Sequence, residues 1–123
     1  MEAKMHKKIL IIDDEEGIRE SLKLILSDYY DLVLTDGGEQ ALEVLNHADD
    51  IGLIFLDIKM RKVNGLDVLK EIKAHAPRVP VVMVTGYKSV ETAAEAARLG
   101  ASGYIVKPFK LEEILETAKK HIA

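Results

Sequence analysis

Four polar residues of this sequence stand directly after short apolar runs, and a fifth, Asp14, follows the first of them: Asp13, Asp14, Asp57, Thr85 and Lys107. Carboxylates that lie a few ångströms apart raise one another's pKa unless a cation shares their site. Oxygen ligands without His or Cys suit Mg²⁺, which commonly binds one or two carboxylates together with a phosphate. If the fold brings these residues together, they form a site for Mg²⁺ and a phosphoryl group.

The apolar run Leu53–Leu56 has no polar residue and is followed at once by Asp57. Such a run predicts a strand that is buried on both faces, as in a parallel sheet covered by helices. In open α/β sheets, ligands bind outside the carboxyl ends of the strands. Asp57 is therefore the first candidate for a reacting group.

Five apolar runs divide the chain, and they begin at Ile9, Leu32, Leu53, Val81 and Tyr104. Each run is followed by a segment with helical spacing, and the expected helices are centred on Ile18–Tyr29, Ala41–Leu45, Leu66–Ile72, Ser89–Leu99 and Leu111–Ala118. Pro77 ends the third of these segments, and Gly100 is the expected left-handed cap of the fourth. Alternating strands and helices predict five βα units, a parallel sheet and right-handed crossovers.

The strand order follows from the apolar content of the runs. Those starting at Ile9, Leu53 and Val81 are the longest without a polar residue, so we expect them at the centre of the sheet and the other two at its edges. This predicts a doubly wound α/β fold with the flavodoxin-like order 2-1-3-4-5. Its switch point, between the first and third strands, places Asp13 and Asp14 beside Asp57.

Length and composition restrict the classes of protein. The 123 residues suit one domain, over 1–123, and the net charge of −4 argues against binding to nucleic acid or an anionic membrane by bulk charge. The chain has no Cys, and no apolar run approaches the roughly 18 residues that a membrane span needs. We therefore expect a cytoplasmic domain that binds neither nucleic acid nor membrane directly.

Four motifs together carry a family resemblance: Asp13-Asp14-Glu15, Asp57-Ile58-Lys59-Met60 with Asn64-Gly65, Val84-Thr85-Gly86, and Lys107-Pro108-Phe109. In this order and spacing, the chain resembles the receiver domain of bacterial two-component response regulators over nearly its whole length. It is similar to chemotaxis regulators. The segment Val90–Gly100 with its Thr-Gly-Tyr lead also resembles receivers attached to transcriptional activators of the nitrogen-regulator type.

The resemblance implies a role for each matched residue. Asp57 would be the phosphoacceptor, attacking the phosphohistidine of a sensor histidine kinase. Asp14, Asp57 and the backbone carbonyl of Lys59 would ligate Mg²⁺, and Asp13 would act mainly through water. Lys107, before a cis proline bond, would pair with the phosphoryl oxygens. The domain would be no enzyme beyond catalysing its own phosphorylation and slow autodephosphorylation.

The same resemblance implies a switch. Thr85 would move its hydroxyl to the phosphoryl group, Gly86 would leave room for it, and Tyr104 would turn from exposed to buried. The surface formed by the fourth helix, fifth strand and fifth helix would then be read by an effector domain, an effector protein or a second copy in a homodimer. Lys59 and Tyr87 would hinder the water that hydrolyses the phosphate.

Two residues depart from the family pattern. Arg61 stands where the family usually has Pro, and with Lys59 and Lys62 it makes the loop basic, so we predict weaker Mg²⁺ affinity than in a proline-containing relative. Lys110 stands where a helix N-cap is often Asp or Ser, and loss of a cap costs about 1 kcal/mol.

Other functions remain to be weighed. Lys59 argues against a phosphatase with an aspartate nucleophile, which would have a second Asp at that position. The acids Asp13-Asp14-Glu15-Glu16 argue against a nucleotide-binding module, which would have a glycine-rich loop in their place. A phosphate-independent interaction scaffold on the same fold stays open. Taken singly, the acids could be helix caps, Thr85 and Lys107 could be structural, and His6, His47, His75 and His121 have no metal spacing.

Overall fold

The computed structural model describes residues 7–122, and its centre is a parallel sheet in the order β2-β1-β3-β4-β5. The strands are β1 (Lys8–Ile12), β2 (Asp31–Thr35), β3 (Ile51–Leu56), β4 (Val81–Thr85) and β5 (Gly103–Val106). The predicted fold class and strand order are confirmed. His6 and the ends of the predicted domain lie outside the described residues.

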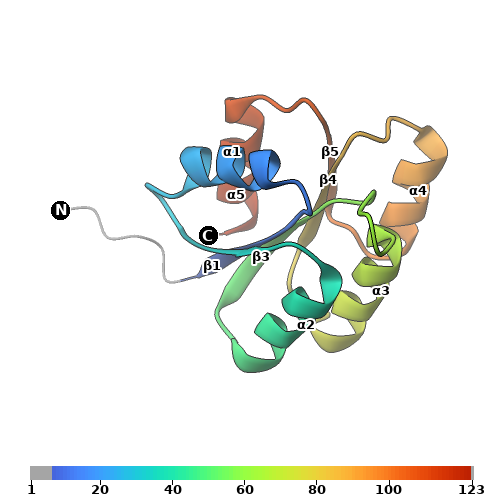
Figure 1. Cartoon of the computed structure of the whole chain (residues 1–123), viewed down its shortest axis with the longest axis horizontal. Coiled ribbons are helices and arrows are strands. Elements are labelled where there is room, and N and C mark those ends of the chain that lie inside the picture. Colours follow the sequence, from blue (N-terminus) through green and yellow to red (C-terminus); the bar gives the residue numbers. More distant parts are fainter. Residues whose placement is uncertain (1–6, 123) are drawn as a thin grey trace.

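Helices cover both faces of the sheet (Figure 1). One face carries α1 (Glu16–Leu26) and α5 (Leu111–His121), and the other carries α2 (Gly38–His47), α3 (Gly65–His75) and α4 (Val90–Arg98). None of these described helices is long and apolar enough to cross a membrane. The result is the helix, sheet and helix layering that alternating βα units require.

Side chains of the central strands alternate between two apolar cores. Leu10 and Ile12 of β1 point to the core under α2, α3 and α4, while Ile9 and Ile11 point to the core under α1 and α5. Every residue of β3 and β4 is buried, whereas most residues of β2 and β5 are only partly buried. Each large apolar side chain buried in this way stabilises the fold by roughly 1.5–3 kcal/mol. The unbroken apolar runs therefore identified the central strands correctly.

The ladder of the sheet continues one residue beyond three strands and so fixes the backbone at their carboxyl ends. The N–H of Asp13 donates to the carbonyl of Thr35 at 3.1 Å, and the N–H of Asp57 donates to Ile12 at 3.0 Å. The N–H of Lys107 donates to Thr85 at 2.8 Å. These bonds place the two acids and the amine of Lys107 on the same edge of the sheet.

The starts of α3 and α5 differ in detail from what the sequence predicted. Asn64, predicted as part of a turn, is the N-cap of α3, where its Oδ1 accepts from the N–H of Leu66 at 2.8 Å. The Lys110 side chain has no acceptor to offer at the start of α5, but Oε1 of Glu113 accepts from the Lys110 N–H at 3.4 Å. The cap predicted to be lost at Lys110 is thus partly replaced from the third helical residue.

Gly100 has a φ of 103° at the end of α4, as predicted for a left-handed cap, and a Cβ there would lie 3.3 Å from Cγ of Lys73. We expect Gly100→Ala to lower the free energy of unfolding by about 1 kcal/mol, because an L-residue is strained in this region. Urea unfolding measures the change. Gly17→Ala in α1, where nothing lies within 4 Å, is the control and should be neutral or stabilising. Equal losses for both variants would contradict the interpretation.

Candidate functional site

Lys107 joins the acids at the carboxyl edge of the sheet. Its Nζ lies 2.9 Å from Oδ2 of Asp13, 3.2 Å from Oδ2 of Asp57 and 3.4 Å from Oε1 of Glu15. The side chains of Asp13 and Asp57 are each 3% exposed, and that of Lys107 is 13% exposed. Three elements that are distant in the sequence therefore deliver a buried ion-pair cluster, and the predicted strand order had placed Asp13 beside Asp57.

The three aspartates form a compact set of oxygen ligands. One carboxylate oxygen from each of Asp13, Asp14 and Asp57 lies within 4.8 Å of the others. Oδ1 of Asp57 is buried and has no hydrogen-bond partner among the described residues. A buried acceptor without a partner is costly unless a ligand or ion satisfies it. The oxygen-only set and this open acceptor fit a hard divalent cation such as Mg²⁺.

Burial and charge act against each other in this cluster. Burial raises the pKa of Asp13 above its ordinary value, although the N–H of Glu15 and the ammonium of Lys107 partly oppose the rise. Burial alone would lower the pKa of Lys107, but its hydrogen bond to Asp13 and the charges of Asp13 and Asp57 outweigh this and raise it. Lys107 is therefore held in its charged form at neutral pH, as a fixed positive group beside Asp57.

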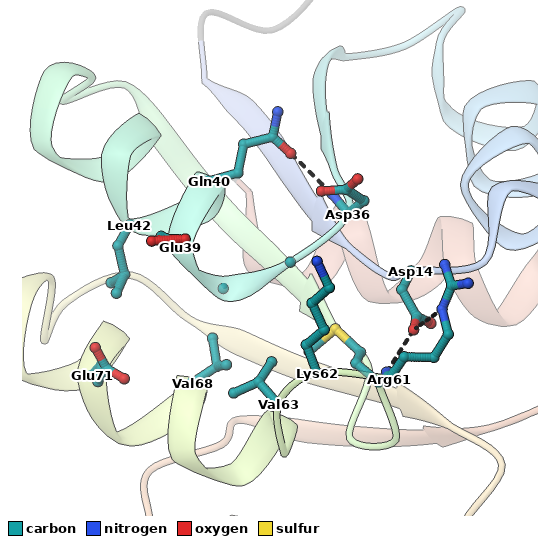
Figure 2. A pocket seen from close by; sticks show the side chains of 13 residues that line it. Asp14, Asp36, Glu39, Gln40, Leu42, Arg61, Lys62, Val63, Val68 and Glu71 are labelled. Atoms are coloured by element: carbon teal, nitrogen blue, oxygen red, sulfur yellow. Dashed lines mark hydrogen bonds and ion pairs between the residues drawn. The ribbon is translucent and has the colours of Figure 1, made fainter.

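Asp14 has a different partner. Its Oδ2 accepts from the backbone N–H of Arg61 at 2.7 Å and from Nε of Arg61 at 3.4 Å (Figure 2). The Asp14 side chain is 12% exposed, whereas that of Arg61 is 85% exposed. The basic loop that the sequence indicated thus reaches the acids, but through one specific residue.

Three contacts that position the acids were missed by sequence reasoning. Nη1 of Arg19 donates to the backbone carbonyl of Asp13 at 2.7 Å. The N–H of Glu15 donates to Oδ1 of Asp13 at 2.9 Å. A Cβ on Gly65 would lie 2.0 Å from the carbonyl oxygen of Asp57, so only Gly fits against the backbone of that residue. For Gly65, the sequence signal was its place in the Asn64-Gly65 motif.

Thr85 is fully buried next to the cluster, and among the described residues no hydrogen bond joins it to Asp57. Its Oγ1 accepts from the N–H of Tyr87 at 3.4 Å, and the hydroxyl of the half-buried Tyr104 donates to the carbonyl of Tyr87 at 3.0 Å. The two residues expected to take part in a switch therefore bind the same intermediate residue through its backbone.

Two hollows adjoin the acids. One, of about 280 Å³, lies over Asp57 and is lined by Glu15, Asp57, Lys59, Gly86, Tyr87 and Lys107. The other, of about 780 Å³, lies between α2 and the loop that follows β3, and Asp14, Arg61 and Lys62 are on its rim (Figure 2). Asp57 lines the smaller hollow and not the larger one. Lys59, Gly86, Tyr87 and Lys107, which were expected around the phosphoryl group, line the same hollow, whereas Thr85 is buried and does not. The Lys107-Pro108 bond is cis, as expected.

Comparison with known proteins decides the family, because residues 9–119 match the response regulator receiver domain. The chain belongs to this family. Receiver domains of response regulators are signalling domains of two-component systems. The acidic cluster described above is therefore a candidate metal site in a signalling domain.

Individual relatives agree with this assignment. The chain is 37% identical over 116 residues to the transcriptional regulatory protein ZraR of Escherichia coli, covering 94% of this chain and 26% of ZraR. It is 37% identical over 110 residues to the regulatory protein AtoC of the same species, covering 87% of this chain and 23% of AtoC. The chain thus spans about a quarter of the length of these curated relatives.

Solved structures show the same receiver fold. The receiver domain of NtrX from Brucella abortus superposes with a TM-score of 0.86 at 38% identity, covering 93% of this chain and 97% of that one. A CheY-like receiver domain protein from Methanospirillum hungatei gives 0.89 at 30% identity, covering 96% and 94%. The predicted resemblance to chemotaxis regulators and to receivers of transcriptional activators is confirmed.

We expect Lys107→Met to lower the free energy of unfolding by roughly 3 kcal/mol at pH 7, because two buried carboxylates lose their counter-ion. Since the pKa of Lys107 is raised above 10.5, the wild-type contribution is complete at this pH. The difference should shrink as the pH falls toward 3.8, because the pKa of Asp13 is raised and a protonated acid needs no counter-ion. Urea unfolding at several pH values measures both effects.

The matched control for this prediction is Lys88→Met, which removes a positive charge from an exposed position after β4. It should change the free energy of unfolding by less than about 0.5 kcal/mol. A Lys107→Met loss that was no larger, or that was independent of pH, would show that the buried ion pairs contribute little.

Proposed function

We propose that Asp57 accepts a phosphoryl group from the phosphohistidine of a sensor histidine kinase. An oxygen of Asp57 attacks the phosphorus, the bond between phosphorus and the imidazole nitrogen breaks, and the imidazole leaves with the bonding electron pair. The product is an acyl phosphate on Asp57. The observation that carries the proposal is the pairing at Asp57, whose Oδ2 lies 3.2 Å from Nζ of Lys107 while its buried Oδ1 has no hydrogen-bond partner among the described residues.

Mg²⁺ is the proposed cofactor, held by Asp14, Asp57 and the backbone carbonyl of Lys59, with Asp13 acting mainly through water. When bound, the ion neutralises charge on the transferring phosphoryl group. Lys107 supplies a second positive charge and pairs with a phosphoryl oxygen. The chain's own residues therefore contribute positioning and charge, which is most of what phosphoryl transfer requires.

Thr85 and Tyr104 are the proposed switch residues. When the Thr85 hydroxyl turns to the phosphoryl group, its hydrogen bond from the Tyr87 N–H is lost, and the Tyr87 carbonyl that Tyr104 binds is free to move with the loop. This would couple the site to the surface of α4, β5 and α5. We infer that an effector domain, an effector protein or a second copy of the chain reads that surface, with no direct contact to nucleic acid or membrane.

We propose that residues 1–123 belong to one cytoplasmic receiver domain, which is not an enzyme in its own right. Its output is a separate question, because ZraR and AtoC are about four times as long and are named as regulatory proteins. A phosphate-independent interaction scaffold is the alternative. The two are separated by whether Asp57 takes up phosphate at all.

We expect incubation with acetyl phosphate and Mg²⁺ to add one phosphoryl group, measured by intact mass spectrometry. Asp57→Asn should abolish the gain, because an amide is not a carboxylate nucleophile. Asp36→Asn is the control, since Asp36 is an exposed acid that directly follows β2 at the same edge of the sheet, and it should keep the gain. No gain in the wild-type chain, or a gain that survives in Asp57→Asn, would favour the scaffold.

Lys59 and Tyr87 line the hollow over Asp57 and are expected to slow hydrolysis of the phosphate by excluding water. We expect Lys59→Ala and Tyr87→Ala each to increase the dephosphorylation rate several-fold, measured as the decay of the phosphorylated mass after the donor is removed. Lys88→Ala is next to Tyr87 but does not line this hollow, so its decay rate should match the wild type. Unchanged rates in all three variants would contradict the proposed shielding.

A further inference from the structure

The three acids of the site do not share one counter-ion. Asp13 and Asp57 both pair with Lys107, whereas among the described residues no hydrogen bond or ion pair joins Asp14 to Lys107, and Asp14 pairs with Arg61. Both Arg61 donors, the backbone N–H at 2.7 Å and Nε at 3.4 Å, bind the same oxygen, Oδ2 of Asp14. Each acid of the candidate metal site therefore already has a cation of the protein beside it.

We propose that the Arg61 guanidinium is a resident counter-ion at Asp14 that competes with Mg²⁺, so that Arg61 sets the metal affinity of the site. This inference rests on the proposed function, because it concerns the same Mg²⁺ site. It goes further in assigning the competition to one side chain and to one carboxylate oxygen.

The geometry favours exchange over a permanent bond. A guanidinium and a divalent ion on the same carboxylate repel each other, so binding of one weakens binding of the other. The Arg61 side chain is 85% exposed, and an exposed ion pair is weak enough to be displaced. The backbone N–H can stay, because a carboxylate oxygen has a second lone pair for the metal.

The loop keeps Arg61 close to Asp14 whether or not the side chain is bound. A bridge between Lys59 and Asn64 closes the loop, and the N–H of Gly65 donates to the carbonyl of Ile58 at 2.7 Å. The N–H of Arg61 then ties the loop to Asp14. A tethered competitor acts at a high effective concentration, so a weak ion pair can still change the metal affinity measurably.

Lys62 offers a matched control. It is the next residue of the same loop and carries the same charge, but no hydrogen bond or ion pair joins it to Asp14 in the part of the chain that the structure describes (Figure 2). Loss of either charge reduces the general positive potential of the loop by one unit. Only loss of Arg61 removes the contact.

The test is a calorimetric titration of MgCl₂ into the full chain, its Arg61→Gln variant and its Lys62→Gln variant. We expect Arg61→Gln to bind Mg²⁺ about two to five times more tightly than the wild type, the range expected from one exposed ion pair. Lys62→Gln should show less than half of that gain. The difference between the variants should shrink in 1 M NaCl, because salt screens the competing charge.

Thermal unfolding supplies a second readout that does not depend on phosphorylation. Arg61→Gln should melt at or below the wild-type temperature without metal, and saturating Mg²⁺ should raise its melting temperature by more than it raises that of the wild type. Equal affinity gains in the two variants, or no gain in Arg61→Gln, would overturn the inference while leaving the Mg²⁺ site in place. Absence of any Mg²⁺ binding by the wild type would overturn the metal site and the inference together.

Discussion

The interaction on which the site depends is the buried ammonium of Lys107 between the carboxylates of Asp13 and Asp57. Two carboxylates this deeply buried repel each other and lose hydration, so each is tolerable only with a cation or hydrogen-bond donors nearby. Lys107 meets that need for one oxygen of each acid. The other oxygen of Asp13 accepts from the Glu15 N–H, while the other oxygen of Asp57 has no partner among the described residues. The arrangement thus leaves one acceptor open at one acid.

A parallel sheet is what makes this arrangement reproducible. The N–H groups of Asp13, Asp57 and Lys107 each donate to the neighbouring strand just beyond the last strand residue, so the three backbones are as well fixed as the ladder itself. The acids come from the two strands at the switch point of the order β2-β1-β3-β4-β5. Burial of both faces of β3 supports the ladder from either side. The precision of the site therefore comes from the core and not from the loops.

The sequence predicted what depends on periodicity and on chain order. Unbroken apolar runs identified the central strands, and the residue after each run identified Asp13, Asp57, Thr85 and Lys107 as neighbours. It did not predict contacts that depend on where one backbone group meets another. The closeness of Gly65 to the Asp57 carbonyl and the bond from Arg19 to the Asp13 carbonyl have no periodic signature, because their partners are main-chain atoms brought near by tertiary packing. Arg19 belongs to α1, and its long side chain reaches back from the helix to that carbonyl.

The β3–α3 loop shows the same difference between what the sequence predicts and what depends on tertiary contacts. Its composition indicated only a high positive charge, which would act on all three acids according to distance. The structure instead divides the acids between two cations, with Lys107 on Asp13 and Asp57 and Arg61 on Asp14. Glu15 also lies 3.4 Å from Lys107, so four carboxylates face these two cations and the shared edge keeps a negative charge. Because Lys107 is largely buried and Arg61 is exposed, displacing Arg61 from Asp14 would cost a divalent ion less than displacing Lys107 from Asp13.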